Sequence, residues 1–217
     1  MRDTRFNAIM TAIVPTVAHA RGLTRGYMAY YTTEAQLFLK ERPHPHATES
    51  LQAIGCTMES DILTRGKMYQ LSGPFGQHPI SGQAMIKHNR YTQCKVGTHT
   101  PDPNNLAGKA SISALGKVLD MQFDDVNQPL GGWNLDVVAE HEFADTATTP
   151  GQSHVYKFEM IYRFGVYTPL INEWHQIENA SEILFHGTLH SKDPLTGRFI
   201  VHHLFIKPDI AHLKLSA

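Results

Sequence analysis

Hydrophobic and polar residues alternate along most of the chain after Lys109. Alternation with a period of two is typical of strands that bury one face. Segments rich in proline, glycine and asparagine separate the alternating runs, as expected for turns. The pattern predicts five antiparallel strands joined as hairpins, at residues 109–124, 133–143, 155–167, 182–190 and 198–207, with a helix or wide turn at 169–179.

The first half of the chain has a different pattern. Residues 6–17 are mostly apolar and include isoleucine and valine, which predicts a strand. Apolar residues recur at helical spacing over residues 47–64, and Ser81 is suited to cap a short helix over residues 81–91. By composition, residues 71–79 and 98–108 are expected to be loops, and residues 27–40 fit either a strand or a helix.

These elements together predict an α+β fold. A chain of 217 residues with no visible linker fits one domain, residues 1–217. We expect residues 1–108 to form a mixed part with short helices. Residues 109–207 are expected to form a curved antiparallel β-sheet, a barrel or half-barrel built from hairpins. No internal repeat is visible.

Composition and charge narrow the classes of function. Hydrophobic residues make up 41% and charged residues 18% of the chain, which is enough apolar material for a core. The formal net charge is −1, whereas general nucleic-acid binders usually carry a basic surplus. Tight, sequence-independent binding to nucleic acid is therefore not expected, and nucleic acid is the less favoured partner.

The two cysteines and the N-terminal segment bear on location. Two cysteines without a CxxC motif favour a reduced, cytoplasmic chain over a disulfide scaffold. Residues 1–20 have the outline of an export signal, but the polar residues and the proline within them favour a strand, and the choice stays open. No apolar run reaches the roughly 20 residues that a transmembrane helix needs.

The last hairpin can be given a register. The turn from Asp193 to Gly197 has a proline and a late glycine at positions that suit a type I turn. If Ser191 faces Arg198, then Glu182 falls opposite Lys207 on the outer face. The inward face then holds Ile183, Phe185, Leu189, Ile200, Leu204 and Ile206, and it also places His202 inward, opposite Gly187.

The preceding hairpin joins residues 133–143 to residues 155–167. A register with Phe143 against His154 sets Glu140 opposite Lys157, and a slip by two residues would leave the inward face unchanged. The inward side chains are then Trp133, Leu135, Val137, Ala139 and His141 on one strand, and Tyr156, Phe158, Met160, Tyr162 and Phe164 on the other.

Four polar side chains are thus predicted on apolar strand faces: His141, Tyr156, Tyr162 and His202. An imidazole beside a phenol can transfer protons near neutral pH. This predicts a cofactor-independent enzyme of the isomerase, dehydratase or cyclase type, or a small-ligand binder, with these four residues lining an aromatic cavity. The alternative for each residue is a buried position in the core, with its hydrogen bonds satisfied and no ligand nearby.

No cofactor and no metal are expected. The chain has no glycine-rich phosphate loop and no HExxH motif, and its cysteines lack a nucleophile motif. His186 and His203 would face each other across the last hairpin, but two ligands make a weak metal site.

Two other classes of function stay open. Residues 79–88, Pro79-Ile80-Ser81-Gly82-Gln83-Ala84-Met85-Ile86-Lys87-His88, resemble a helix start in backbone subunits of CRISPR ribonucleoprotein complexes. That resemblance implies a ferredoxin-like core that carries guide RNA, with Lys87, His88, Arg90 and Lys95 facing the RNA. The other class is a structural, capsid-like assembly protein, and in either case the chain is compatible with a homo-oligomer.

Overall fold

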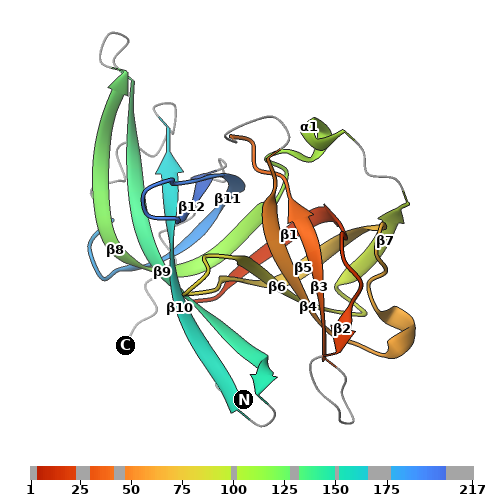
Figure 1. Cartoon of the computed structure of the whole chain (residues 1–217). Coiled ribbons are helices and arrows are strands. Elements are labelled where there is room, and N and C mark those ends of the chain that lie inside the picture. The colour runs from red at the N-terminus through yellow and green to blue at the C-terminus, as the bar shows by residue number, and fades with distance from the viewer. Residues whose placement is uncertain are drawn as a thin grey trace.

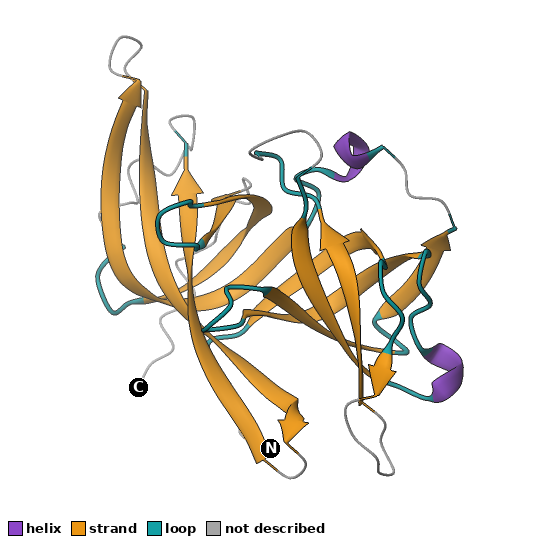
Figure 2. Ribbon diagram, in the orientation of Figure 1, coloured by secondary structure: helices purple, strands orange, loops and turns teal. Residues whose placement is uncertain are grey.

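The computed structural model describes residues 4–22, 30–41, 47–98, 102–127, 132–149, 152–165 and 177–203. Nearly all of the regular structure in these ranges is β-strand (Figure 2). The helices there are the 3-10 turn η1 (Glu59–Asp61) and α1 (Pro103–Leu106). No helix in the described ranges is long and apolar enough to cross a membrane.

The second half of the chain forms a closed five-stranded barrel. Its strands are β8 (Ser111–Asn127), β9 (Gly132–Thr149), β10 (Gln152–Phe164), β11 (Glu182–Lys192) and β12 (Phe199–His203). The order around the barrel is β8–β9–β10–β12–β11, and β11 pairs back to β8. All of these neighbours are antiparallel except β10 and β12, which run parallel. The barrel, one of the two forms predicted for this half, is confirmed, whereas the parallel pair of β10 and β12 departs from the purely antiparallel sheet that was predicted.

The first half repeats this strand order. It contains β1 (Ala8–Pro15), β2 (Arg21–Gly22), β3 (Tyr30–Leu37), β4 (Glu49–Cys56), β5 (Met68–Gln77), β6 (Ala84–Asn89) and β7 (Gln93–Gly97). The order β1–β3–β4–β6–β5 returns to β1, and β4 and β6 are the parallel pair. A bridge between Thr16 and Ala35 closes the contact from β1 to β3. Both halves therefore have the strand order of the OB fold, a five-stranded Greek-key barrel, a repeat that the sequence did not reveal.

The prediction of an α+β fold with helices in the first half is wrong. The segment predicted as a helix over residues 47–64 contains β4, and the segment over residues 81–91 contains β6. On β4, Leu51 and Ala53 are buried, and Ile54 is buried as well, although it points to the opposite face. A strand buried on both faces loses its strict alternation and imitates helical spacing.

β5 crosses the segment predicted as a loop at residues 71–79. Its glycines stand where other groups approach the strand closely. A Cβ atom at Gly76 would overlap the ring of Phe143, and one at Gly73 would overlap the backbone carbonyl of Lys87. The glycines therefore serve packing within a strand and do not mark a turn.

The first strands of the two barrels pair with each other. β1 lies antiparallel to β8, from Ala8 opposite Ala114 to Thr11 opposite Ser111. Figure 1 shows the two barrels side by side, with β1 to β7 on one side and β8 to β12 on the other. One cluster of buried hydrophobic residues runs through both barrels. The junction falls at the change of pattern near Lys109, and the single domain of residues 1–217 stays a prediction.

The inward face predicted for β9 and β10 is confirmed where side chains are described. The pairing is shifted by two residues, since Lys157 pairs with Glu142 along the strands. The ammonium group of Lys157 nevertheless lies 2.8 Å from the carboxylate of Glu140. Of the side chains predicted to face inward, Tyr156 is half-buried, and the buried ones are Leu135, Val137, Ala139, His141, Phe158, Met160, Tyr162 and Phe164.

The prediction that Ile200 and His202 of β12 point inward is wrong. A register shift between Leu189 and Ser191 sets Leu189 opposite Val201. Phe199 and Val201 then point into the shared core, whereas Ile200 packs on the outer face. A one-residue slip moves every side chain of a strand to its other face. Phe185 and Leu189 are buried as predicted, while Leu204, Ile206 and Lys207, the predicted partner of Glu182, lie outside the described residues, as does most of 169–179.

We expect Gly76→Ala to lower the free energy of unfolding by about 1–3 kcal/mol, the usual penalty of overpacking a core. The added methyl group meets the ring of Phe143, which is itself buried and anchors the β9–β10 hairpin on the first barrel. Urea denaturation of the variant and the parent protein measures the difference.

Gly22→Ala is the matched control, because a Cβ atom there has no neighbour within 4 Å. It should change the free energy of unfolding by no more than about 0.5 kcal/mol. Equal effects of the two substitutions would contradict the proposed packing of Phe143.

Candidate functional site

Two of the predicted site residues meet inside the second barrel. The hydroxyl of Tyr162 lies 2.9 Å from Nε2 of His141, and both side chains are fully buried. The Tyr162 ring stacks on Phe185 at 3.8 Å between centroids. Gly116 lies beside the imidazole, and a Cβ atom at Gly116 would come within 2.6 Å of it.

The hydrogen bonds of His141 are consistent with a neutral ring. Nδ1 lies 3.1 Å from the carbonyl oxygen of Leu115, so Nδ1 donates to that oxygen and Nε2 accepts from Tyr162. Burial lowers the pKa of His141 to about 4 and raises the pKa of Tyr162 well above its ordinary value. Near neutral pH the His141 ring is therefore neutral, with its proton on Nδ1, and the Tyr162 hydroxyl keeps its proton.

The other two predicted site residues lie elsewhere. Tyr156 is half-buried, with its ring 5.7 Å from that of His78. His202 points away from the barrel core and stacks on His190 at 3.5 Å between centroids. His190 lies 3.1 Å from the carboxylate of Glu41. The structure therefore brings His141 and Tyr162 together but does not bring His202 into the same space.

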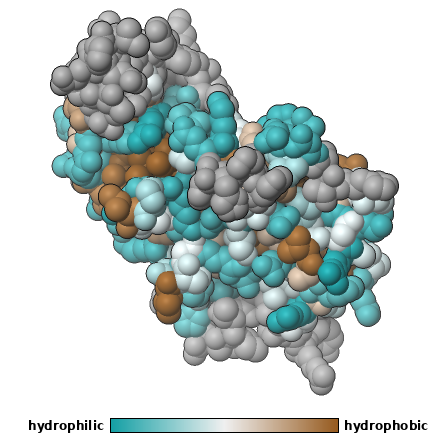
Figure 3. Space-filling view, turned by 45° about the horizontal axis from the view of Figure 1, so that its top comes forward, coloured by the Kyte–Doolittle hydropathy of each residue, from teal (hydrophilic) through white to brown (hydrophobic). Residues whose placement is uncertain are grey.

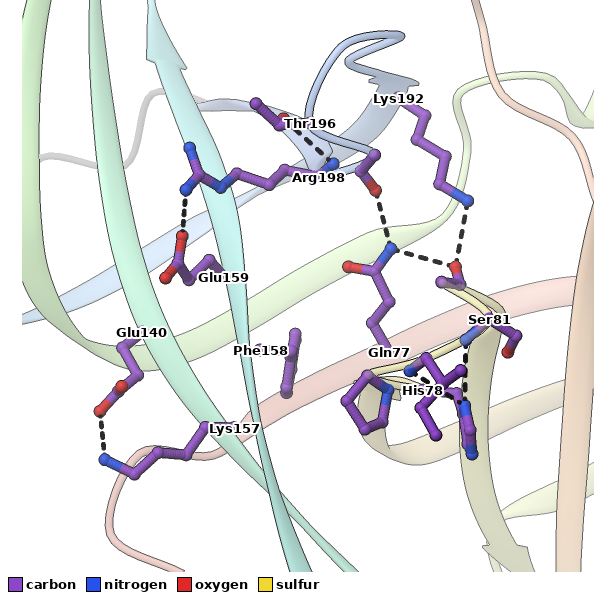
Figure 4. Close-up of a pocket in the computed structure, with 14 residues that line it drawn as sticks. Gln77, His78, Ser81, Glu140, Lys157, Phe158, Glu159, Lys192, Thr196 and Arg198 are labelled. Atoms are coloured by element: carbon purple, nitrogen blue, oxygen red, sulfur yellow. Dashed lines mark hydrogen bonds and ion pairs between the residues drawn. The ribbon is translucent and has the colours of Figure 1, made fainter.

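A hollow on the surface unites residues that the sequence analysis had not assigned to a common site (Figure 4). It has a volume of about 540 Å³ and lies between three elements. One wall is the outer face of β9 and β10, and the other walls are the loop after β5 and the loop after β11. We call it the groove. Its lining includes Gln77 to Gly82, Glu140, Lys157 to Glu159, Lys192 and Thr196 to Arg198.

Each cation of the groove is paired with a carboxylate. Lys157 lies 2.8 Å from Glu140, and Arg198 pairs with Glu159 (Figure 4). Lys192 lies 2.5 Å from Glu49, which stands outside the groove. These side chains keep part of their surface exposed, so each pair contributes little to stability and can be exchanged for other charged partners.

Hydrogen bonds hold the two loops of the groove against each other. The side-chain amide of Gln77 donates to the carbonyl oxygens of Gly82 at 3.0 Å and Gly197 at 2.7 Å. Lys192 also donates to the carbonyl of Gly82 at 3.0 Å. The loop of the first barrel is thus tied to the loop of the second, and the groove between them has a defined shape.

The rim of the groove presents a ring and an apolar side chain. Nδ1 of His78 lies within 3.4 Å of the backbone N–H groups of Ile80 and Ser81, so it accepts from them. Ile80 is 92% exposed. Figure 3 shows a mainly hydrophilic face of the molecule, with hydrophobic residues gathered on the left, over the second barrel. The groove therefore combines paired charges with a small apolar rim.

No protein-family model matches the chain, and no curated protein sequence matches it. Several solved structures do match, and two of them follow. The wild-type single-stranded DNA-binding protein from Thermus aquaticus is 14% identical, with 92% of this chain and 90% of that chain covered and a TM-score of 0.50. A deletion mutant of that protein is also 14% identical, with 94% of each chain covered and a TM-score of 0.51. The chain shares their fold.

These findings correct the predicted function. The small-molecule enzyme or ligand binder required a cavity shared by His141, Tyr162 and His202, but the first two are sealed in the core and the third lies on the other face. The proteins of the same fold are named as single-stranded DNA-binding proteins. The prediction of an isomerase, dehydratase or cyclase with these residues in one cavity is therefore wrong.

The details of the CRISPR resemblance are also wrong. Its helix is replaced by a turn and β6, and the core has barrels where a ferredoxin-like sheet was implied. His88 points into the first barrel and is buried, whereas Lys87 points outward to the carbonyl of Ala144. Arg90 and Lys95 are exposed. Lys87 and His88 thus point to opposite faces of β6.

The groove residues escaped sequence reasoning because they come from distant segments. The turn from Asp193 to Gly197 was visible in the sequence, whereas residues 79–82 were predicted as the end of a loop and the start of a helix. Their meeting depends on the pairing of the two barrels, which no local pattern shows. Among the described residues, no group of three or more histidine, cysteine, aspartate or glutamate side chains is placed to hold a metal, and the absence of a metal stays an expectation.

The buried histidines predict a pH dependence of stability. Burial lowers the pKa of both His88 and His141 to about 4, from 6.5. Between these values the unfolded chain binds protons that the folded chain does not, so the free energy of unfolding falls as the pH is lowered from 6.5 to 4. Each such group contributes at most about 1.4 kcal/mol per pH unit.

Urea denaturation between pH 4 and pH 7 tests this dependence. His141→Gln removes one titrating group, so its stability should depend less steeply on pH in this range, although the variant starts less stable. His19→Gln changes an exposed histidine and should leave the parent's dependence intact. If His141→Gln kept the full dependence, the buried histidine would not be its source.

Proposed function

We propose that this chain binds single-stranded nucleic acid in an extended form along the groove. The observation that supports this most is the position of the groove. It lies on the outer face of strands two and three of the second barrel, β9 and β10, beside the loop between strands four and five. OB folds bind oligonucleotides at this position. Both proteins of similar fold reported above are named for binding single-stranded DNA.

The groove residues have chemistry suited to such a ligand. Lys157, Lys192 and Arg198 can each exchange a carboxylate for a phosphate of the backbone. The imidazole of His78 and the exposed side chain of Ile80 offer surfaces against which bases pack. Duplex DNA keeps its bases stacked inside and cannot use these surfaces.

The charge of the chain sets the strength of binding. The net charge is −1, and the three cations of the groove are already paired. Electrostatic steering is therefore weak, and few counterions are released on binding. We propose binding of modest affinity with a shallow dependence on salt.

A cytoplasmic setting is part of the proposal. Cys56 and Cys94 are both free thiols, as in chains that work under reducing conditions. The homo-oligomer expected from the sequence stays a prediction.

Replacing Arg198 by alanine should weaken binding to oligothymidylate and leave the fold intact. The change removes one phosphate partner and leaves Glu159 unpaired beside the ligand. The slope of log affinity against log salt should flatten by about 0.7, the contribution of one phosphate contact in a single strand. Fluorescence anisotropy with a labelled oligonucleotide at several salt concentrations measures both quantities.

Lys95→Ala is the control, since it removes an exposed cation of β7, away from the groove. It should leave affinity and slope near those of the parent. Absence of any binding by the parent protein at low salt, or equal loss in both variants, would contradict the proposed function.

A further inference from the structure

A second hollow adjoins the groove on the side of the first barrel. It has a volume of about 370 Å³ and is lined by Leu39 and Glu41 after β3, by Ala47 to Glu49 at the start of β4, and by the loop after β11. Lys192 and Gly197 line both the groove and this hollow. The two spaces therefore meet at Lys192, at the junction of the two barrels.

The second hollow differs from the groove in its chemistry. Leu39, Ala47 and Pro194 give it an apolar lining, while Glu41 and Asp193 add carboxylates. The hydroxyl of Thr196 donates to Asp193 and holds the pKa of that carboxyl below its usual range, so it is ionised at neutral pH. Such a space repels phosphate. It suits a base, whose ring packs on apolar groups and whose amino groups donate to carboxylates.

Lys192 stands where the two spaces join. Its ammonium group lies 2.5 Å from Glu49 and 3.0 Å from the carbonyl oxygen of Gly82, and its side chain is 22% exposed. Glu49 lines only the second hollow, and Gly82 lines only the groove. A phosphate that reached Lys192 would replace Glu49 while the hydrogen bond to Gly82 stayed in place.

We propose that one nucleic-acid strand crosses from the groove into the second hollow at Lys192, where a phosphate displaces Glu49 and the next base enters the hollow. This inference rests on the proposed function. It adds a base-binding subsite on the first barrel, so that a single strand contacts both barrels. Glu49 then acts as an intramolecular competitor that weakens binding.

The test compares short and long oligodeoxycytidylates, whose amino groups suit the carboxylates of the hollow. We choose lengths of about 5 and about 20 nucleotides, because OB folds occupy roughly 4–16 nucleotides each. Affinity is measured by fluorescence anisotropy over a range of salt concentrations, with the whole chain of 217 residues.

Glu49→Gln should tighten binding of the long oligomer several-fold. Its salt slope should stay close to that of the parent, because the same phosphate is neutralised at Lys192 in both proteins. Glu182→Gln is the matched control: it makes the same change in an ion pair, with Arg5 at 2.6 Å, that lines neither space. Equal effects of the two substitutions would mean that only net charge matters and would overturn the inference.

A second pair of variants tests the hollow itself. Pro194→Glu adds a carboxylate to the hollow. It should weaken binding of the long oligomer several-fold and leave binding of the short one unchanged. Leu195→Glu places the same charge on the neighbouring residue, which is 93% exposed and lines neither space, and should spare both. Weakening of the short oligomer by Pro194→Glu, or equal weakening by both variants, would overturn the crossing.

Thermal melting confirms that each variant folds, and Thr48→Glu, another exposed residue of the hollow, replaces Pro194→Glu if that variant does not. Different results would contradict the proposed function and the crossing at Lys192. If the parent binds neither oligomer, the proposed function fails. If the parent binds both but the paired variants do not differ, only the crossing at Lys192 fails.

Discussion

The pairing of β1 with β8 is the contact on which the rest of this structure depends. Through it the first strand of each barrel also belongs to the sheet of the other, from Ala8 opposite Ala114 to Thr11 opposite Ser111. The hydrophobic core then runs through both barrels without a break. The same arrangement brings the loop after β5 against the loop after β11, where Gln77 donates to Gly197. Neither barrel alone supplies the walls of the groove.

Contacts between the halves add to this pairing. Phe143, from the long β9–β10 hairpin, lies on Gly76 of the first barrel, and Lys87 reaches back to the carbonyl of Ala144. Lys192 and Glu49 form an ion pair across the junction. These contacts surround the groove. The same packing therefore holds the two barrels together and sets the shape of the groove.

Local pairing of charge is what makes the proposed binding of an anion compatible with a nearly neutral chain. Net charge governs long-range steering, whereas affinity at contact depends on which cations a ligand can reach. In the groove each reachable cation has a carboxylate within exchange distance, which limits promiscuous attraction to polyanions. The histidines in the two barrel cores are neutral, in contrast to the ion pairs of the groove. His88 beside Gly55 and His141 beside Gly116 are buried and neutral, and each has hydrogen-bond partners.

The sequence by itself determined the strands of the second half, but not whether they close into a barrel. Period-two alternation on one-sided strands such as β9 and β10 marked both the strands and their inward face, including His141 and Tyr162. It did not determine the first half, because β4 and β6 are buried on both faces and show no alternation. Nor could it locate the register shift at Leu189, which turned His202 outward, since one inserted residue leaves the local pattern unchanged. The groove was decided by tertiary structure alone. Its lining residues come from five segments, and only the pairing of the two barrels brings Gln77, Glu140, Lys157, Lys192 and Arg198 to one place.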